Sequence, residues 1–202
     1  YVIPSGKALP NSNTTFLIHS DWKGGPGADA SGNSNNFNAT GFTTDSLVAD
    51  TPKNNYCTFL PIVKSRAGTI TYSFGNLKAT NTQYDSICPN ILVSSGKWYA
   101  EFTVNSSDSI WATVQVPHIA IDPPGTSHNN PGATGYSNEG AAYQNGNYIP
   151  GWGTKVLPGG IIGVALDVEA RSIEFFNSGV SQGSLLLYGE GSYSKNLMFG
   201  MC

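Results

Sequence analysis

The sequence predicts an all-β protein, built as a sandwich of two packed antiparallel sheets. Turn-forming residues are frequent, with Gly 24 and Pro 12 in a chain of 202 residues. Charged residues make up 11% of the chain, whereas about 25% is usual in globular domains. Aromatic residues also make up 11%, which is enough to build a core. Short runs that alternate apolar and polar residues recur between turn signals, and no stretch shows the periodicity of an amphipathic helix.

Residues 1–49 are predicted to form an N-terminal arm, or part of a preceding module, that contributes about one strand. The apolar run TFLIH at 15–19 is the candidate strand. The stretches at 21–27 and 31–36 are rich in glycine and asparagine, which is typical of loops. The chain starts at Tyr1 and stops within a strand-like run, so we expect a fragment of a longer polypeptide or a processed one.

The middle of the chain contains the clearest alternating patterns. Residues 69–74 and 77–80 are expected to pair through a turn at Gly75 and Asn76. In the run at 97–104, four apolar residues share one face and four mostly polar residues share the other. We predict that the face with Trp98 and Phe102 lies on a core. Residues 110–116 form a further predicted strand, which Pro117 helps to end.

Residues 122–160 are predicted to be a long connection, because proline, glycine and asparagine interrupt them repeatedly. Connections of this length are often functional or ordered around short strands. The apolar run at 161–166 predicts a central strand. Residues 172–180 predict a hairpin that turns at 177–179, and Gly183 is expected to break the strand that follows. Residues 185–188 and 196–199 complete the pattern.

Three stretches resemble the SPRY family. The segment SSGKWYAEFTV at 94–104 is similar to the family strand that reads sGkhYwEv. The segment GGIIGVALDVEARSIEFFNSGVSQG at 159–183 is similar to the family signature GDvIGvalDldagtlsFykNGvsqG, with Gly160 in place of the aspartate. The segment DTPKNNYCTF at 50–59 resembles the opening of SPRY-like modules in bacteriophage tail-fibre and other virion proteins. The resemblance covers residues 50–202.

The resemblance implies a concanavalin-like SPRY sandwich over residues 50–202 that serves as a binding or scaffold module without catalysis. It also implies a virion protein located at the virion surface, outside the cell, and needing no cofactor. Tail fibres are usually symmetric homo-oligomers, and a trimer is the favoured assembly. Within the signature, Asp167 is expected to begin the turn between two core strands, and Asn177 and Gly179 to support a tight hairpin.

The patterns of known catalytic and metal sites find little support. The run GVSQG at 179–183 matches the G-x-S-x-G pattern of a hydrolase nucleophile, but that pattern requires a strand, a sharp turn and a helix. A hairpin is expected here instead. His19, His118 and His128 lack the spacing of metal ligands. Glu174 is expected on the solvent side of its strand rather than in a catalytic pair of carboxylates.

Composition also excludes several partners. The net charge is −3 and the basic residues are scattered, so we expect no binding to nucleic acid. The longest apolar run, at 160–166, is far too short to span a bilayer, so no membrane insertion is expected. Cys57, Cys88 and Cys202 lack metal-site spacing and are predicted to be buried free thiols, with a Cys57–Cys88 disulfide as the open alternative.

The long connection carries the best candidates for a binding site. Tyrosine and tryptophan rings supply flat apolar area, and neighbouring amides supply hydrogen bonds, as on sugar-binding and paratope-like surfaces. We expect the three tyrosines to lie at the surface and the tryptophan, which stands between two glycines, to pack inward. The candidate binding residues are Tyr136, Tyr143, Tyr148, Trp152, His128, Asn129 and Asn130.

Our leading hypothesis is a virion module, part of a tail fibre or appendage, that binds a host surface glycan or receptor through residues 118–158. A second hypothesis is a capsid or tail decoration domain that contacts neighbouring virion subunits. A third is a cellular SPRY module that binds a peptide. A polysaccharide depolymerase is the enzymatic alternative, but it lacks a credible pair of carboxylates.

Overall fold

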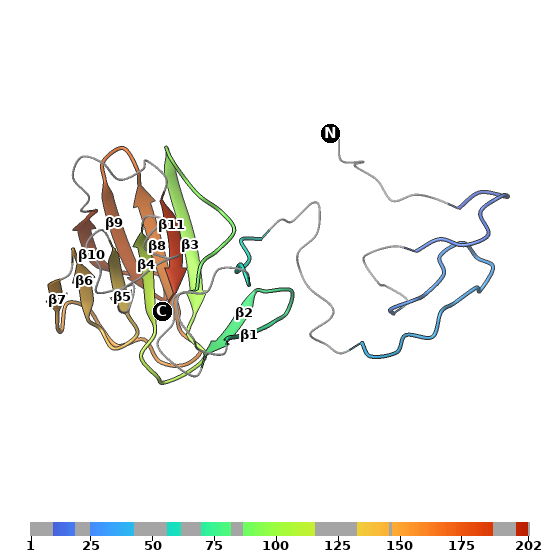
Figure 1. Ribbon diagram of the computed structural model, residues 1–202, viewed down its shortest axis with the longest axis horizontal. Coiled ribbons are helices and arrows are strands. Elements are labelled where there is room, and N and C mark those ends of the chain that lie inside the picture. Colours follow the sequence, from blue (N-terminus) through green and yellow to red (C-terminus); the bar gives the residue numbers. More distant parts are fainter. Residues whose placement is uncertain are drawn as a thin grey trace. The chain divides into compact units, whose positions relative to one another are not determined.

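The structure is a computed structural model that describes residues 10–18, 25–42, 56–61, 70–81, 87–115, 133–145, 147–187 and 197–201. The chain divides into two compact units, Tyr1–Tyr56 and Cys57–Cys202. The regular secondary structure of the described ranges consists of strands β1 to β11 (Figure 1). No helix long and apolar enough to cross a membrane occurs within these ranges. The predicted boundary between residues 49 and 50 lies outside them and stays a prediction.

In the N-terminal unit, the carboxylate of Asp29 organises the described loops. Its Oδ1 accepts hydrogen bonds from the backbone N–H groups of Leu17 and Ser31, at 2.9 and 2.8 Å. Its Oδ2 accepts from the Ser31 hydroxyl at 2.6 Å and from the Asn35 N–H at 3.0 Å. The predicted loop at 31–36 is confirmed. The strand predicted at 15–19 is wrong over 15–18, because the Leu17 N–H bonds to a side chain instead of a neighbouring strand.

The same carboxylate should make this unit sensitive to acid. Burial raises the pKa of Asp29, but the hydrogen bonds from Ser31, Leu17 and Asn35 outweigh it and lower the pKa from 3.8 to about 2. A depressed pKa contributes stability that is present above the unfolded-state pKa and is lost as the pH falls through the folded-state pKa. We therefore expect the amide proton shifts of Leu17 and Asn35, measured by NMR, to titrate with a midpoint at about pH 2, below the ordinary value of 3.8.

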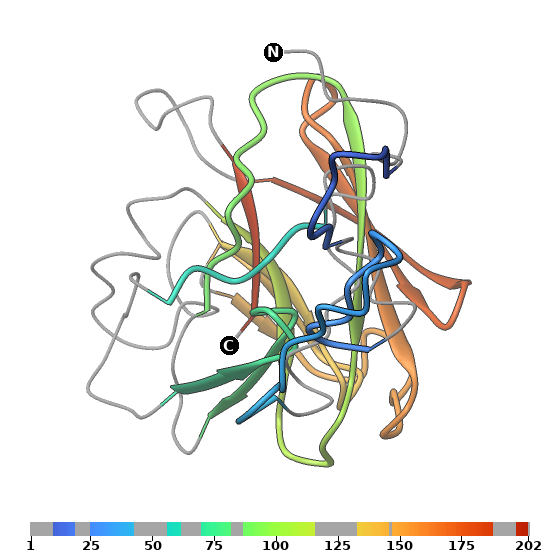
Figure 2. The same cartoon turned by 90° about the vertical axis from the view of Figure 1, so that its right-hand side faces the viewer.

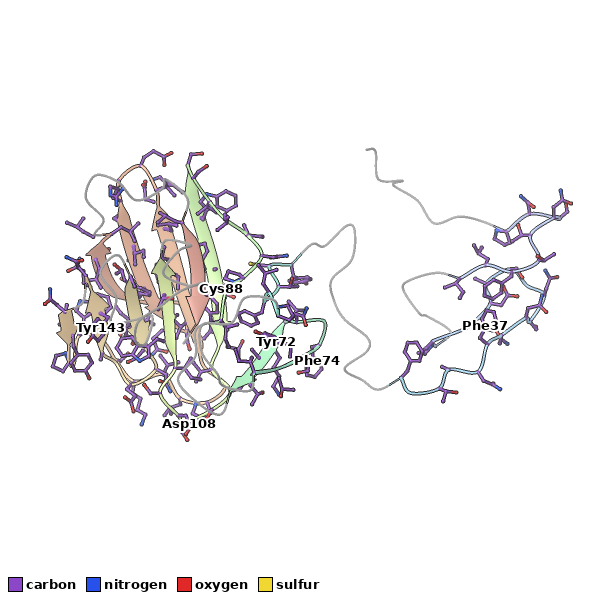
Figure 3. The ribbon with its side chains drawn as sticks, viewed as in Figure 1. Phe37, Tyr72, Phe74, Cys88, Asp108 and Tyr143 are labelled. Atoms are coloured by element: carbon purple, nitrogen blue, oxygen red, sulfur yellow. The ribbon has the colours of Figure 1, made fainter. Side chains whose placement is uncertain are left out.

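Asp29→Asn, which removes the charge, should abolish that titration and weaken the hydrogen bonds at every pH. Shifts that titrate in the parent chain with a midpoint near the ordinary value of 3.8 would contradict this account. The unit also carries a ring pair at its surface, in which Phe16 and Phe37 meet edge-on with centroids 4.9 Å apart. Phe37, labelled in Figure 3, is 62% exposed.

In the second unit, one sheet has four antiparallel strands in the order β10-β9-β8-β3. Ala100 and Phe102 pack against the core while Lys97 and Tyr99 are exposed, so the predicted alternation is confirmed. Trp98 shares the inward face, although 45% of it remains exposed. The central place predicted for the run at 161–166 is also confirmed. The bounds are β3 Lys97–Thr103, β8 Ile161–Asp167, β9 Ser172–Asn177 and β10 Val180–Leu186.

Two tight turns join the last three strands of this sheet. Asp167 accepts the Ala170 N–H at 2.8 Å through Oδ1, which confirms it as the turn residue. Ser178 and Gly179 both have positive φ, 48° and 86°, as a two-residue hairpin turn requires. Strand β10 continues through Gly183, where the register shifts after Ser181. The expectation that Gly183 breaks the strand is therefore wrong, because a β-bulge accommodates it.

The second sheet has five antiparallel strands in the order β11-β4-β5-β6-β7. Strands β5, β6 and β7 all lie within residues 122–160, so that stretch is only partly the loop that we predicted. Strand β5 pairs with β4, β6 with β5 and β7 with β6, and strands this short leave little pattern in the sequence. The bounds are β4 Trp111–Gln115, β5 Thr134–Ser137, β6 Ala142–Gln144, β7 Asn147–Ile149 and β11 Met198–Met201.

A separate two-stranded sheet pairs β1, Ile70–Ser73, with β2, Lys78–Asn81, close to the predicted positions. Its hairpin carries Tyr72 and Phe74, both labelled in Figure 3. The two larger sheets form separate layers, with β5 and β6 in yellow and β8 and β9 in orange (Figure 1, Figure 2). Their facing sides build one hydrophobic core, which includes Ala112, Val114, Tyr136, Ile162, Val164, Leu166, Ile173, Phe175 and Phe199.

Two cysteines, Cys57 and Cys88, lie within the described residues, and they do not form a disulfide with each other. Cys88 is fully buried, as predicted, and is labelled in Figure 3. Cys57 is exposed, so the prediction of a buried thiol is wrong there, because the chain at 56–57 lies at the surface. The alternative of a Cys57–Cys88 disulfide is not realised. Cys202 lies outside the described residues.

Candidate functional site

The four aromatic residues of the predicted binding surface lie on opposite faces of the five-stranded sheet. Tyr136 points inward and is 0% exposed. Its hydroxyl donates a hydrogen bond to the carbonyl oxygen of Thr154, and its ring lies 5.7 Å from that of Phe175. The expectation that Tyr136 lies at the surface is therefore wrong. Burial raises the pKa of its phenol, which stays protonated at neutral pH and continues to donate.

Trp152 packs on the same inward side. Its ring meets Tyr136 at 5.7 Å and Phe175 at 6.0 Å, both edge-on. A Cβ atom on Gly183 would lie 3.3 Å from the Trp152 ring, so the bulge in β10 brings backbone close to the indole. This placement agrees with the expectation that Trp152 packs inward. Trp152 and Tyr136 thus support the fold rather than offer a contact surface.

Side-chain hydrogen bonds fix the segment around Trp152 against β9 and β10. The backbone N–H and the hydroxyl of Thr154 both donate to Oε1 of Gln182, each at 2.8 Å. The Asn177 amide donates to Thr154 Oγ1 at 3.0 Å and to the Lys155 carbonyl oxygen at 3.1 Å. These bonds join the chain after β7 to the opposite sheet, and so they give the β6–β7 hairpin a rigid base.

Tyr143 and Tyr148 lie on the outward face, where Trp111 joins them. The two tyrosines stand directly opposite each other in the β6–β7 pair, with ring centroids 5.7 Å apart. Trp111 on β4 meets Tyr143 edge-on at 5.5 Å and Tyr148 at 6.3 Å. We call these three rings the aromatic cluster. Figure 3 shows Tyr143 at the β6–β7 edge of the sandwich.

Exposure rises across the aromatic cluster from its base to its edge. Trp111 is 5% exposed and Tyr148 is 54% exposed, with Tyr143 between them. The Tyr148 ring is supported by its contacts with the Trp111 ring at 6.3 Å and the Tyr143 ring at 5.7 Å. Tyr148 therefore presents a ring to solvent from a supported position, which reduces the entropy lost when a flat ligand stacks on it.

The stretch of sequence that carries the two tyrosines of the cluster is almost uncharged. Between residues 133 and 152, Glu139 is the single charged residue in the sequence. Asn145 is exposed in the β6–β7 turn with φ 49°. Asn147 is also exposed, but it alternates with Tyr148 along β7 and therefore faces the other way. The site suits a neutral ligand with a flat apolar face and hydroxyl groups.

Sequence reasoning missed Trp111 as part of this site. Its place at the start of the predicted strand at 110–116 already put it on the opposite face from Ala112 and Val114. The partner strands, which the sequence did not reveal, bring it under the tyrosines. His128, Asn129 and Asn130 lie outside the described residues, so their predicted binding role stays a prediction.

The structure gives the catalytic and metal patterns no further support. Ser181 lies within β10, and its hydroxyl donates to Oε1 of Glu174 at 2.6 Å. It therefore does not stand on the sharp turn that a hydrolase nucleophile occupies. Glu174 lies on the outward side of β9, as predicted. In the described part of the chain, no group of three histidine, cysteine or acidic residues is arranged to hold a metal ion.

Comparisons with solved structures find β-sandwich proteins. The structure of stonustoxin has a TM-score of 0.53 and 16% identity, over 72% of this chain and 25% of the stonustoxin chain. The PSpry domain of TRIM65 has a TM-score of 0.47 and 17% identity, over 72% of this chain and 83% of that domain. The SPRY domain of human HERC1 has a TM-score of 0.45 and 18% identity, over 58% of this chain and 72% of that domain.

The predicted fold class is confirmed. The described strands form two packed antiparallel sheets, the SPRY-like sandwich that the motifs at 94–104 and 159–183 predicted. At these identities the likeness to solved structures concerns the fold alone. No protein-family model matches the sequence, and no curated protein gives a significant match.

Proposed function

We propose that this chain is a non-enzymatic binding module whose aromatic cluster holds a neutral surface glycan. The exposed ring of Tyr148, supported by Tyr143 and Trp111, is the observation that carries the proposal. The C–H face of a sugar ring stacks on such an aromatic side chain, while its hydroxyl groups bond to phenol and amide groups nearby. The single charged residue between residues 133 and 152, Glu139, leaves the stretch that carries the two tyrosines nearly neutral, which favours a glycan over an ionic ligand.

The virion setting rests on the sequence motifs that resemble tail-fibre modules. A small aromatic site of this kind binds weakly, so a homo-oligomer, with a trimer favoured, would raise its affinity through multivalency. The host surface supplies many copies of one glycan, which is the arrangement that multivalent binding needs. We therefore propose a place at the virion surface, facing the host cell.

The test is a glycan-array and cell-surface binding assay with the domain displayed in several copies. Tyr148→Ala should weaken monovalent binding about tenfold, equivalent to about 1.4 kcal/mol, and should reduce multivalent binding by much more. Tyr99→Ala is the matched control, because Tyr99 is 55% exposed and Tyr148 54%, on different sheets. On the glycan array, where no protein partner is present, the control should bind like the parent, and thermal melting should show that both variants are folded.

Equal losses in both variants, or no binding by the folded multivalent parent, would reject the glycan site. The second candidate function, contact with neighbouring virion subunits, would then take its place. Exposed apolar side chains favour it: Leu157 is 65% exposed and Val180 is 66% exposed. Both lie near the β9–β10 turn, where the Ser178 N–H donates to the Ile161 carbonyl oxygen at 2.8 Å. A cellular peptide-binding module would instead show binding to peptides and none to glycans.

A further inference from the structure

The outward face of the four-stranded sheet is a second exposed surface, separate from the aromatic cluster. The pairing register places Tyr99, Ala165 and Glu174 in one row across β3, β8 and β9. Glu101, Gly163 and Phe176 form the adjacent row. The middle strand thus contributes only small apolar residues to this face, and the larger side chains come from the strands on either side.

Tyr99 forms the centre of this face. Its ring leans over Gly163, where a Cβ atom would overlap the phenol, and meets Phe176 edge-on with centroids 6.2 Å apart. Its hydroxyl donates to Oε1 of Glu101 at 3.0 Å. The ring is held from three sides but remains 55% exposed. It is a fixed aromatic surface that a planar group can cover.

Two carboxylates lie on this face, Glu101 beside the ring and Glu174 two strands away, and each has one oxygen in a hydrogen bond. Glu101 uses Oε1 to accept from Tyr99, and Glu174 uses Oε1 to accept from the Ser181 hydroxyl at 2.6 Å. Within the described ranges, neither Oε2 has a hydrogen-bond or ion-pair partner. Both carboxylates are therefore oriented by one bond and available for another.

The charge of the face is unbalanced. Lys97 is the cation among the outward residues of the four strands, and its ammonium lies 3.0 Å from the carboxylate of Asp167. That pair is neutral and leaves the charges of Glu101 and Glu174 uncompensated within the described structure. A partner that fits must bring positive charge together with a planar or apolar group.

We propose that this face binds an extended, arginine-bearing segment of a partner protein. A guanidinium group stacks on an aromatic ring and bonds to a carboxylate through two parallel N–H groups, so it can satisfy Tyr99 and Glu101 together. Lysine offers the charge without the planar stack. The segment would lie over the Tyr99 ring, which covers Gly163 of β8.

The sheet geometry also sets the spacing that the segment needs. Glu101 and Glu174 are two strands and two residues apart, or about 12 Å between backbones. Four residues of extended chain cover about 13 Å, and positions i and i+4 point to the same side. Two arginines separated by three residues can therefore reach both carboxylates at once.

The probe is the peptide GRSTSRG with blocked ends, titrated against the full chain and followed by NMR shifts and calorimetry. The control peptide carries citrulline in place of both arginines, which keeps the shape and removes the charge. We expect the arginine peptide to bind, with shifts on β3 and β9, and the citrulline peptide to bind at least tenfold more weakly. Higher salt should weaken the arginine complex.

The variant E101Q/E174Q should lose at least tenfold in affinity for the arginine peptide, whereas Glu139→Gln, which alters an exposed carboxylate on the other sheet, should bind like the parent. If the double variant melts early, Glu101→Gln alone is informative, since Glu101 is exposed. Absence of arginine-peptide binding, equal binding of the citrulline peptide, or unchanged affinity in the folded acid variants would overturn the proposal. Glycan binding is measured on the same variants, so the two sites are tested separately.

Discussion

Replacing Phe175 with alanine is expected to lower the free energy of unfolding by about 3–5 kcal/mol, the usual cost of removing a fully buried phenylalanine ring. Phe175 is 0% exposed, and its ring packs against Tyr136 from the other sheet and against Trp152. Its loss therefore removes contact between the two sheets and leaves a cavity where they meet. Urea denaturation followed by tryptophan fluorescence measures the change.

The neighbouring residue provides the control for this change. Phe176 has the same side chain but faces outward, where it is only partly buried beside Tyr99. Phe176→Ala should cost less than half as much as Phe175→Ala. If the alanine variant of Phe175 does not fold, Phe175→Leu, with an expected cost of about 1–1.5 kcal/mol, gives a measurable value. Equal costs at both positions would contradict the assignment of inward and outward faces.

Replacing Gly140 with alanine is expected to cost about 3 kcal/mol, from strain at positive φ together with a steric overlap. Gly140 has φ +88°, and a Cβ atom there would lie 2.7 Å from the carbonyl oxygen of Gly153. The two residues are also joined by a hydrogen bond, because the Gly153 N–H donates to the Gly140 carbonyl oxygen at 2.9 Å. The substitution should therefore push away the segment that carries Trp152.

A substitution at Gly179 separates the cost of backbone strain from the cost of steric overlap. Its φ is +86°, almost the same, but a Cβ atom there would meet nothing within 4 Å. Gly179→Ala should cost only the strain of about 1–2 kcal/mol. The difference between the two variants in urea denaturation measures the overlap. A Gly140 variant no less stable than the Gly179 variant would show that the Gly153 segment moves aside freely.

The sequence predicted the strands whose pattern is local. Apolar and polar residues alternate from Trp98 to Val104, and the run at 161–166 is almost entirely apolar. Ser178 and Gly179 suit a two-residue hairpin turn. Each of these signals lies within a few residues of the chain. Strands β5 to β7 are only three or four residues long and include Gly135, so their pattern is too short to recognise. They are ordered by pairing with one another and, through β5, with β4.

The candidate site was predicted only in part for the same reason. Tyr143 and Tyr148 were correctly expected near the surface, but Tyr136 resembles them in its sequence neighbourhood and is buried. Tyr136 differs from the other two tyrosines in its non-local partner. The carbonyl oxygen of Thr154 accepts a hydrogen bond from the Tyr136 hydroxyl, and so the ring can lie in the core. The wrong prediction of a strand at 15–18 has a similar origin, because Asp29 accepts a hydrogen bond from the Leu17 N–H across the loop.

The way Asp29 holds the N-terminal unit has a thermodynamic consequence. The described loops are joined by hydrogen bonds to one carboxylate, and the aromatic Phe37 is already mostly in contact with solvent. Unfolding the described loops of this unit therefore exposes little new apolar surface, so the heat-capacity change of this part per residue falls below the usual value of about 12–15 cal/mol/K. Its stability curve is correspondingly flat, and cooling weakens it far less than it weakens the sandwich, whose core depends on the hydrophobic effect.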